Sequence, residues 1–466
     1  MALAVVLAAA CAGGTAHASA RGRFAVGFTS VGALDRAVAS VHGVVLRTVA
    51  PLHVATVQGA DARTLRRLPG IRFVQRVAPR ASAGEPVTIA PEWQLVATHT
   101  TSVPETVLHD AAAITIAVVD TGADLSAPEL AAKSPATWNT RTQTTDVRDT
   151  NGHGTFVASL AAGTVSGAGG DAQLLVVKSG TDGGSFTDVD EAAGIIYAVD
   201  HGARIVNLSV GGPTTSTTER LAIRYAVDHG ALVVAAAGNE HDEGNPVEYP
   251  AALLQPVDSN GVGGRGLVVT AAGADGTRAP FANTGSWISL AAPGERVFGS
   301  VSQLSSPALY PRAGGELYGY ASGTSFAAPQ VAGAAALVWA ADPSLTAQQV
   351  AQILKETASG EGRWTRDLGY GTIDVAAAVA RAQQGRVGVL LGGLRRNDHA
   401  RLRWSGDGAA YTLTMSVDRH APRTLLSSTL TTSTTVSVAR GHVYAFTVTS
   451  LDAQGTPTAT STVTLR

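Results

Sequence analysis

The sequence predicts an α/β protein built on a mostly parallel, doubly wound sheet, preceded by a smaller α+β unit and followed by an all-β sandwich. Three observations predict this order. Strand-like and helix-like segments alternate over residues 21–80, five aliphatic runs alternate with helical segments over residues 114–273, and residues 386–466 show only strand-like alternation. A length of 466 residues fits about three domains.

Composition and charge exclude several classes of protein. Hydrophobic residues make up 45% and charged residues 15%, which excludes a disordered or collagen-like chain. The net charge of −2 argues against a nucleic-acid binder. The charge is unevenly placed, because residues 21–89 carry 10 Arg against 3 acids, residues 386–466 carry 9 Arg against 4 Asp, and the middle is strongly acidic.

The first 20 residues are small and apolar and end in two A-x-A sites, Ala16 to Ala18 and Ala18 to Ala20. This pattern is typical of a secretory signal peptide over residues 1–20 and predicts a secreted protein. Cys11 is the only cysteine, so a disulfide within the chain is excluded. A lipid anchor at Cys11 is the alternative, but Ala8 stands where a large apolar residue is usual. No later run reaches about 18 apolar residues, so we expect no membrane span; the longest, Val331 to Ala341, is typical of a buried helix.

The first unit alternates between strand and helix signals. We expect strands at residues 23–28 and 71–77, two short strands within 44–57, and helices at 31–41 and 61–68. The order βαββαβ predicts a ferredoxin-like unit. Residues 81–91 contain Gly84, Pro86 and Pro91 and are predicted to be a linker.

The middle of the chain carries the five near-continuous aliphatic runs, at residues 114–120, 172–178, 203–210, 231–239 and 266–273. Strands buried on both faces have this composition, which predicts a parallel sheet covered by helices. The hexapeptide AVDHGA occurs at 198–203 and again at 226–231. We expect a helix to end at His201 and at His229, with both imidazoles in structural roles at the negative end of the helix.

The last part of the chain has no helical period. Strand-like alternation appears at residues 402–404, 411–417, 434–438, 443–449 and 458–465, with turn signals between them. This predicts a small β-sandwich over residues 386–466. We expect Trp404 and Tyr444 to be core residues of it rather than ligand contacts.

Four polar residues mark a candidate catalytic site. Ligands bind outside the carboxyl ends of the strands in an open α/β sheet. Asp120 closes the first aliphatic run and Asn239 the fourth, while His153 and Ser325 each precede an apolar helical segment.

These residue types fit nucleophilic catalysis. A serine hydroxyl is a weak nucleophile that needs an imidazole to take its proton and a carboxylate to hold that imidazole in the right tautomer. It also needs donors aimed at the developing oxyanion. We predict Asp120, His153 and Ser325 as the catalytic residues, with the Asn239 amide and the Ser325 backbone N–H as the oxyanion hole.

Four motifs carry a family resemblance. VVDTGAD around Asp120, NGHGTFVA around His153, AAAGN ending at Asn239 and GTSFAAPQVAGAAAL around Ser325 resemble those of subtilisin-like serine proteases, the subtilases, in the family's Asp, His, Ser order. The resemblance covers residues 90–385 and implies a subtilisin-like catalytic domain there. It implies hydrolysis of peptide bonds in polypeptide substrates through an acyl-enzyme.

The resemblance also implies substrate-binding edges. Ser209, Val210 and Gly211 resemble the strand that pairs with an extended peptide beside the S1 pocket, and Gly183, Gly184 and Ser185 resemble the facing edge. The alternative for the first segment is a plain strand-to-loop exit. Glu240 lies near the mouth of the S1 pocket by resemblance and would favour a basic residue there.

Residues 21–85 resemble a subtilase propeptide, an inhibitor and chaperone acting on its own chain. Its positive charge against the acidic middle favours docking. An unrelated basic domain is the alternative. In the family the tail of the propeptide is cut in the active site, which predicts autoprocessing between Arg80 and Glu92.

We expect no required cofactor and no metal ligands. Many bacterial subtilases hold calcium in a loop after the His helix, with an acidic ligand at the position of Glu129. Here residues 161–171 are short and lack the Asn-rich loop, so this site is predicted to be absent. The acidic loop from Asp182 to Asp190 could bind calcium, although surface solvation explains it more simply.

The predicted function is a secreted serine endopeptidase, monomeric and made as a zymogen. The main alternative is a catalytically inactive subtilase fold used for binding or adhesion, with the C-terminal sandwich as the working part. An esterase or peptide ligase on the same scaffold is a third. The sandwich itself resembles a fibronectin type III domain in the placing of Trp404, Val443 to Phe446 and Asp452 to Gly455.

Overall fold

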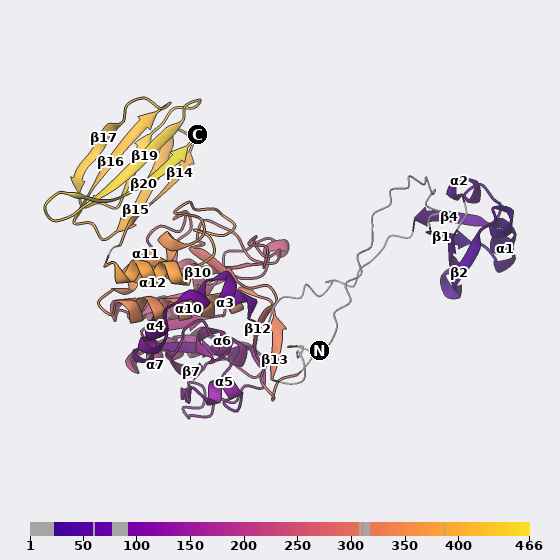
Figure 1. The fold of residues 1–466 in the computed structure, drawn as a ribbon, viewed down its shortest axis with the longest axis horizontal. Coiled ribbons are helices and arrows are strands. Elements are labelled where there is room, and N and C mark those ends of the chain that lie inside the picture. Colours follow the sequence, from indigo (N-terminus) through magenta and orange to yellow (C-terminus); the bar gives the residue numbers. More distant parts are fainter. Residues whose placement is uncertain (1–22, 59–60, 77–91, 307–309, 311–316, 386) are drawn as a thin grey trace, which may run out of the picture. The chain divides into compact units, whose positions relative to one another are not determined.

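The computed structural model describes residues 23–58, 61–76, 92–306, 310, 317–385 and 387–466. It divides into two compact units, residues 1–89 and 90–466, each considered by itself (Figure 1). The predicted signal peptide and the predicted linker at 81–91 lie outside the described residues.

The first unit contains the expected six elements: β1 (Arg23–Phe28), α1 (Val31–Ser40), β2 (Val44–Val49), β3 (Val54–Gln58), α2 (Ala62–Leu65) and β4 (Ile71–Arg76). Its strands form an antiparallel sheet in the order β2-β3-β1-β4. The Ser30 side chain caps α1 and the Asp61 side chain caps α2. The predicted βαββαβ order is therefore present, with a second helix shorter than expected.

A seven-stranded parallel sheet forms the centre of the second unit, in the order β11-β10-β9-β8-β5-β7-β6. Its strands are β5 (Thr115–Asp120), β6 (Ala136–Asn139), β7 (Gln173–Lys178), β8 (Ile205–Leu208), β9 (Leu232–Ala236), β10 (Gly266–Ala272) and β11 (Leu290–Pro293). The five aliphatic runs supply the five central strands, as predicted. The outer strands β6 and β11 were missed because each has four residues without an aliphatic run.

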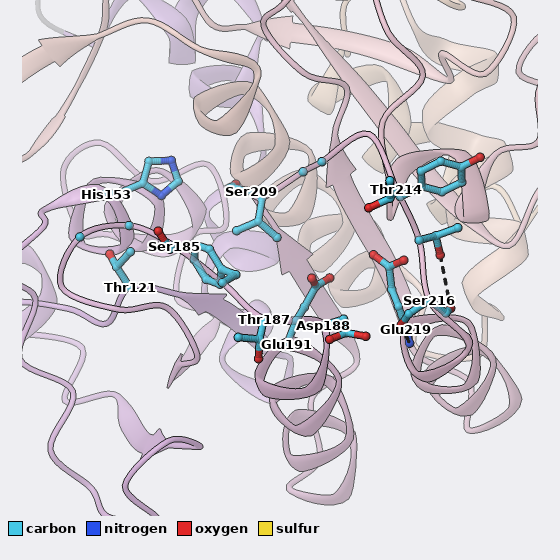
Figure 2. Close-up of a pocket in the computed structure, with 18 of the residues that line it drawn as sticks. Thr121, His153, Ser185, Thr187, Asp188, Glu191, Ser209, Thr214, Ser216 and Glu219 are labelled. Atoms are coloured by element: carbon cyan, nitrogen blue, oxygen red, sulfur yellow. Dashed lines mark hydrogen bonds between the residues drawn. The ribbon is translucent and has the colours of Figure 1, made fainter.

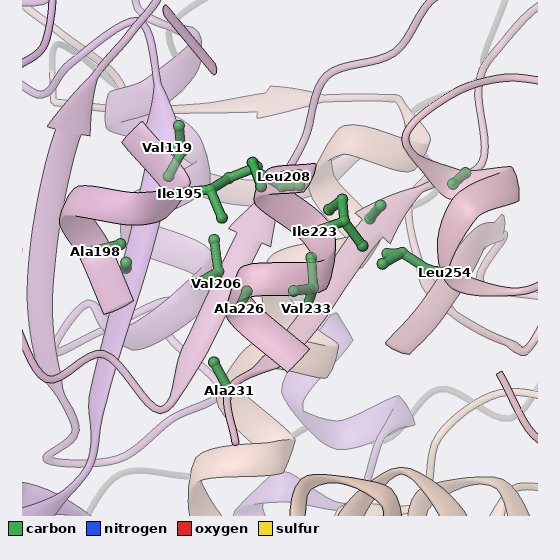
Figure 3. Close-up of a cluster of buried hydrophobic side chains, with 14 of the residues drawn as sticks. Val119, Ile195, Ala198, Val206, Leu208, Ile223, Ala226, Ala231, Val233 and Leu254 are labelled. Atoms are coloured by element: carbon green, nitrogen blue, oxygen red, sulfur yellow. The ribbon is translucent and has the colours of Figure 1, made fainter. Parts of the chain in front are cut away.

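Helices cover both faces of this sheet. They are α3 (Trp93–Ala97), α4 (Glu105–Asp110), α5 (Pro128–Ala131), α6 (His153–Ala162), α7 (Asp188–Asp200), α8 (Thr217–Asp228), α9 (Ala251–Leu254), α10 (Thr324–Ala341), α11 (Ala347–Thr357) and α12 (Val375–Gln383). Figure 3 shows side chains of α7 and α8 packed against β8 and β9 in one buried cluster. A separate two-stranded antiparallel sheet consists of β12 (Val297–Ser300) and β13 (Tyr318–Ala321).

Helix α10 begins at the candidate nucleophile and runs through the core. Its residues from Phe326 to Trp339 are buried, which confirms the buried helix predicted from the apolar run. A Cβ on Gly333 would lie 2.6 Å from the Ala161 carbonyl oxygen, so α10 and α6 pack with their backbones close together. The two helices that carry His153 and Ser325 therefore pack directly against each other.

The two repeated histidines end helices as expected. His201 caps α7 and His229 caps α8, and each Nδ1 hydrogen-bonds the carbonyl four residues earlier at 2.8 Å. Gly202 and Gly230 follow with φ of 83° and 80°, the left-handed conformation that glycine adopts freely. The structural interpretation of both histidines is confirmed.

Two antiparallel sheets face each other at the end of the second unit. The strands are β14 (Val389–Arg396), β15 (His399–Gly406), β16 (Ala410–Val417), β17 (Arg423–Thr429), β18 (Ser433–Ser437), β19 (Tyr444–Leu451) and β20 (Pro457–Leu465). The sheet orders are β14-β15-β18 and β17-β16-β19-β20, and one apolar core lies between them. Strands β14 and β17 were missed, since the first contains Gly392 and Gly393 and the second lies at a largely exposed edge.

Trp404 and Tyr444 are core residues of this sandwich, 1% and 6% exposed, as predicted. The Tyr444 hydroxyl accepts a hydrogen bond from the Ala439 N–H at 2.7 Å, a corner contact that recurs in β-sandwiches. The specific likeness to a fibronectin type III domain stays a prediction. Across the described ranges, no helix is long and apolar enough to cross a membrane.

Candidate active site

Asp120 and His153 are joined by a direct hydrogen bond. Asp120 is the last residue of β5 and fully buried, while His153 is the first residue of α6 and 20% exposed at its side chain. The distance from His153 Nδ1 to Asp120 Oδ1 is 2.7 Å. The Thr121 N–H donates to the same oxygen at 2.7 Å. The carboxylate therefore fixes the imidazole with Nδ1 facing inward and Nε2 facing outward.

A second buried carboxylate, Asp149, holds the beginning of α6. Its oxygens accept from the N–H groups of Gly152 and Thr155, both at 2.8 Å, and from the Thr155 and Thr121 hydroxyls at 2.6 and 2.9 Å. It thus caps the helix that carries His153 and ties it to the residue after Asp120. Sequence reasoning missed Asp149, although an acidic residue just before a helix is a capping signal.

The environment of His153 changes its basicity in two opposing ways. Burial alone lowers the pKa of the imidazole, whereas the charge of Asp120 and the hydrogen bond to it raise that pKa, and the sum lies above the ordinary value of 6.5. The charge of Asp149 acts in the same direction as that of Asp120. His153 is therefore a somewhat stronger base than a free histidine.

Ser325 lies beside this pair. It is the second residue of α10, and the ring of the next residue, Phe326, lies 5.5 Å from the His153 ring. The Ser325 hydroxyl donates to the Ser209 carbonyl at 3.1 Å, while the Ser209 hydroxyl donates to the Ser325 carbonyl at 2.7 Å. Ser325 thus points its hydroxyl at Ser209 rather than at His153, as is common before a substrate tightens catalytic contacts.

Asn239, one of the two predicted oxyanion donors, is hydrogen-bonded to Thr324, the residue before Ser325. The Asn239 Oδ1 accepts from the Thr324 N–H at 2.8 Å and from the Thr324 hydroxyl at 3.1 Å. This orients the amide so that its Nδ2, which has no hydrogen-bond partner in the described part of the chain, is free to donate. Thr324 is a positioning residue that the motif contained but sequence reasoning did not assign.

The six predicted substrate-binding residues line one cleft. The cleft encloses about 800 Å³ and is lined by His153, by Gly183, Gly184 and Ser185 on one side and by Ser209, Val210 and Gly211 on the other (Figure 2). It continues past these edges to the first turns of α7 and α8. The structure therefore places both segments and the imidazole along one cleft, and peptide binding there stays a prediction.

Two glycines make room for the catalytic pair. A Cβ on Gly154 would lie 2.2 Å from the Gly122 carbonyl oxygen and 3.1 Å from Asp120 Oδ1. Gly122 itself has a φ of 114°, and a Cβ there would lie 2.1 Å from the Val147 carbonyl oxygen. Both positions are too crowded for any side chain, so the HGT and DTG segments require glycine for steric reasons.

Glu129 is engaged by hydrogen-bond donors. It is 1% exposed, and its carboxylate accepts from the Val165 and Ser166 N–H groups at 3.1 and 2.9 Å and from the Ser166 hydroxyl. Burial raises the pKa of Glu129, and these donors oppose that rise. Among the residues that the structure describes, no group of three or more His, Cys, Asp or Glu side chains could hold a metal ion.

Two carboxylates, those of Glu240 and Glu248, lie close to the segment that ends at Asn239. Glu240 Oε2 accepts from the Asn239 N–H at 2.7 Å. Burial raises the pKa of Glu248 to about 7, and the neighbouring charge of Glu240 adds to the rise. A Cβ on Gly211 would lie 2.3 Å from Glu248 Oε2, so Glu248 lies directly behind one cleft edge. A preference for a basic residue at S1 stays a prediction.

This combination defines a class of site. A buried carboxylate hydrogen-bonded to an imidazole lies at the carboxyl edge of a parallel sheet, and the residue after a helix-borne serine packs against that imidazole; serine hydrolases use these residue types together. The sequence model of the subtilase family matches residues 111–371, more than half of the chain. The chain belongs to the subtilase family.

Proteins similar to this chain are serine proteases, and the chain matches only part of each of them. The chain is 34% identical over 273 residues to a thermophilic serine proteinase of Bacillus sp. (strain AK1), covering 57% of this chain and 61% of that protein. It is 40% identical over 232 residues to the halolysin-like extracellular serine protease Nep of Natrialba magadii, covering 49% of this chain and 38% of that protein. The chain thus spans less than two thirds of the length of these relatives.

A solved structure supports the fold. The crystal structure of fervidolysin from Fervidobacterium pennivorans, described as a keratinolytic enzyme related to subtilisin, matches 96% of this chain and 76% of its own, with a TM-score of 0.53 at 22% identity. This likeness confirms the subtilisin-like fold of the catalytic region.

Gly154→Ala tests the crowding around the catalytic pair. The added methyl group would push α6 away from Gly122 and lengthen the Asp120–His153 hydrogen bond, so we expect kcat/KM to fall by about 10²-fold or more, since a 1 Å misplacement costs that much. The measurement is kcat/KM on a peptide substrate. Gly202→Ala is the control: its φ of 83° makes the substitution strained and lowers stability, but a Cβ there meets no atom within 4 Å and Gly202 does not line the cleft, so kcat/KM per folded enzyme should stay unchanged. Full activity in Gly154→Ala would contradict the steric argument.

The pH profile tests the role of His153. Protonated imidazole cannot accept the Ser325 proton, so activity should be lost as the pH falls through the pKa of His153. Because that pKa is raised, the acid limb of kcat/KM should have its midpoint above 6.5. The measurement is kcat/KM from about pH 4 to 9. A flat profile, or a midpoint well below 6, would exclude His153 as the base.

Proposed function

We propose that this chain is a secreted serine endopeptidase, made as a zymogen, that cuts polypeptides through an acyl-enzyme. The observation that carries the proposal is the 2.7 Å hydrogen bond between buried Asp120 and His153, beside Ser325 at the start of α10. Family membership and the serine proteinase names of the relatives support the activity.

The proposed first step is attack by Ser325. As a peptide enters the cleft, the Ser325 hydroxyl leaves the Ser209 carbonyl and passes its proton to His153 Nε2, while its Oγ bonds to the scissile carbonyl carbon. Asp120 keeps its negative charge and stabilises the imidazolium that forms. His153 then gives the proton to the departing amine, leaving an acyl-enzyme on Ser325. Water, deprotonated by His153, releases the acyl group.

The proposed oxyanion hole is made of the Asn239 Nδ2 and the Ser325 backbone N–H. Negative charge on the carbonyl oxygen develops only as Oγ attacks, so donors fixed beforehand stabilise the transition state more than the substrate. Asn239 is fixed because Thr324 holds its Oδ1 through two hydrogen bonds. The same helix start therefore carries the nucleophile and orients the donor.

Substrate binding is proposed to occur by strand addition. An extended peptide between Gly183–Ser185 and Ser209–Gly211 would gain main-chain hydrogen bonds from both edges. Such bonds depend little on sequence, so selectivity has to come from the places where side chains enter the cleft.

The flanking parts have proposed roles as well. Residues 21–85, within the first unit, are proposed to be a propeptide that folds and inhibits the catalytic domain in cis, and the 10 Arg against 3 acids of residues 21–89 suit an acidic partner. Secretion is supported by the A-x-A sites in residues 1–20 and by the extracellular relative. We propose the sandwich over 386–466 to be a fibronectin-type-III-like appendage.

The inactive alternative has less support. A binding protein on this fold has no need for a buried carboxylate fixed on an imidazole, a free amide donor and two glycines that admit no side chain. An esterase or ligase would use the same chemistry with another acceptor, and no feature of the cleft favours one over water.

Ser325→Ala tests the proposed activity and its autoprocessing together. Residues 21–466 are expressed as wild type and as Ser325→Ala, and both intact masses are measured. Wild type should lose about 60–70 residues while the variant stays whole, because the cut requires the chain's own nucleophile. If both are cut alike, the cut belongs to another protease and autoprocessing is wrong; if both stay whole, a serine-directed probe decides whether Ser325 reacts at all.

Chelation tests the expectation that no calcium is required. The Glu129 oxygens are occupied by backbone and hydroxyl donors rather than left open for a cation. We therefore propose that excess EGTA leaves both kcat/KM and the thermal midpoint of the mature enzyme unchanged. A drop in the midpoint that added Ca²⁺ restores would show that a calcium site exists and contradict this expectation.

A further inference from the structure

The far end of the cleft is lined by three carboxylates. Asp188 and Glu191 lie in the first turn of α7 and Glu219 in the first turn of α8, and all three line the same cleft as His153. Figure 2 shows Glu191 and Glu219 projecting into one space under the segment from Ser209 to Thr214. We call Asp188, Glu191 and Glu219 the acidic pocket.

Two of these side chains are buried without sufficient partners. Glu191 is 6% exposed and Glu219 is 5% exposed. Glu191 Oε1 and Glu219 Oε2 are both buried atoms without a hydrogen-bond partner. No ion pair of the described residues includes any member of the acidic pocket. Leaving a carboxylate buried and unpaired is costly, so the pocket is built for a group that the free chain does not supply.

The electrostatics agree with this geometry. Burial raises the pKa of Glu191 to about 8, and the charges of Glu219 and Asp188 add to the rise. Burial also raises the pKa of Glu219, against hydrogen bonds from Thr215 and Ser216 and the charge of Arg220 on the neighbouring turn. A cation between the carboxylates would offset the charge repulsion that contributes to the raised pKa of both groups.

Helix capping explains only part of the placing of these residues. Carboxylates are favoured in the first turn of a helix. Here, however, the caps are other side chains, since Thr187 accepts from the Asp190 N–H and Ser216 accepts from the Glu219 N–H. The Glu219 carboxylate faces Thr215 and Ser216 at the start of α8, but its Oε2 has no hydrogen-bond partner in the described part of the chain, and neither has Glu191 Oε1.

A resident metal ion does not fit either. Within the described ranges, no three acidic, His or Cys side chains converge closely enough to bind one. The pocket instead continues directly from the edges Gly183–Ser185 and Ser209–Gly211. An extended peptide on those edges places every second side chain on the same face, so one of them would reach the acidic pocket.

We propose that the acidic pocket binds an arginine or lysine side chain of the polypeptide substrate, at a position N-terminal to the residue whose carbonyl is attacked. This rests on the proposed function and names its selectivity. A guanidinium offers five donors in a planar fork and can bridge two carboxylates, so arginine should be preferred over lysine. The backbone edges would give general affinity and this pocket would choose among sequences.

The experiment compares peptides that carry a single arginine at different positions. Internally quenched peptides keep the residue at the cut constant and carry a single Arg at each of the second to fifth positions before it, each with a Gln counterpart. Mature enzyme is assayed for kcat/KM, and mass spectrometry confirms the bond that is cut. At one position Arg should exceed Gln by about 10–100-fold, the effect of about 1.5–3 kcal/mol for a charged hydrogen bond at 1.4 kcal/mol per tenfold.

The variants assign that preference to the pocket. In Glu191→Gln/Glu219→Gln the Arg-to-Gln ratio at this position should fall to about threefold or less, since neutral amides keep the shape but lose the charge. The ratio is unaffected by a uniform loss of active enzyme. Asp228→Asn, at the exposed far end of α8, is the matched control and should keep the wild-type ratio.

The outcomes separate this inference from the proposed function. If no peptide is cut by wild type, the endopeptidase assignment fails. If peptides are cut but no position favours Arg, or the ratio survives in the double variant, only the acidic-pocket proposal is overturned. The same holds if added Ca²⁺ alters cleavage equally for Arg and Gln peptides in wild type alone, because the pocket would then be an ion site.

Discussion

The hydrogen bond between Asp120 and His153 is the contact on which the rest of the candidate site depends. It joins the end of a buried strand to the start of a helix. Asp149 caps the helix that carries His153 and accepts a hydrogen bond from Thr121, the residue after Asp120. One buried carboxylate therefore holds the segments on both sides of the Asp120–His153 hydrogen bond. Gly122 and Gly154 permit this approach because no side chain fits between the two segments. The result is a preorganised base, as an electrostatic account of catalysis requires.

The cleft combines main-chain edges, which suit many peptide sequences, with places lined by carboxyl groups. We propose that the main-chain edges accept any extended peptide, whereas Glu191 and Glu219 at the far end of the cleft, and Glu248 near Asn239, are carboxyl groups whose pKa is raised by burial. Keeping such groups lowers the stability of the free enzyme. That cost is explained if basic side chains of a substrate neutralise them.

Much of the fold could be predicted because its signals are local. The five central strands are aliphatic runs, and α10 is an apolar run, so burial alone marks them. Strands β6, β11, β14 and β17 could not be predicted, since they are short, glycine-containing or exposed edges stabilised by pairing with distant segments. The motif residues of the site were predicted by type and spacing. Asp149 and the Glu191–Glu219 pair were not, because their roles depend on which atoms meet in space.

The central claim is that Asp120 and His153 activate Ser325. The most direct test is labelling with a fluorophosphonate probe at pH 8, followed by peptide mapping of the adduct and measurement of its rate. We predict a single adduct on Ser325 in wild type and a rate slower by about 10⁴-fold in Asp120→Asn, the loss known for the corresponding change in a serine protease of another fold. An adduct on another serine, or equal labelling rates in both proteins, would contradict the account.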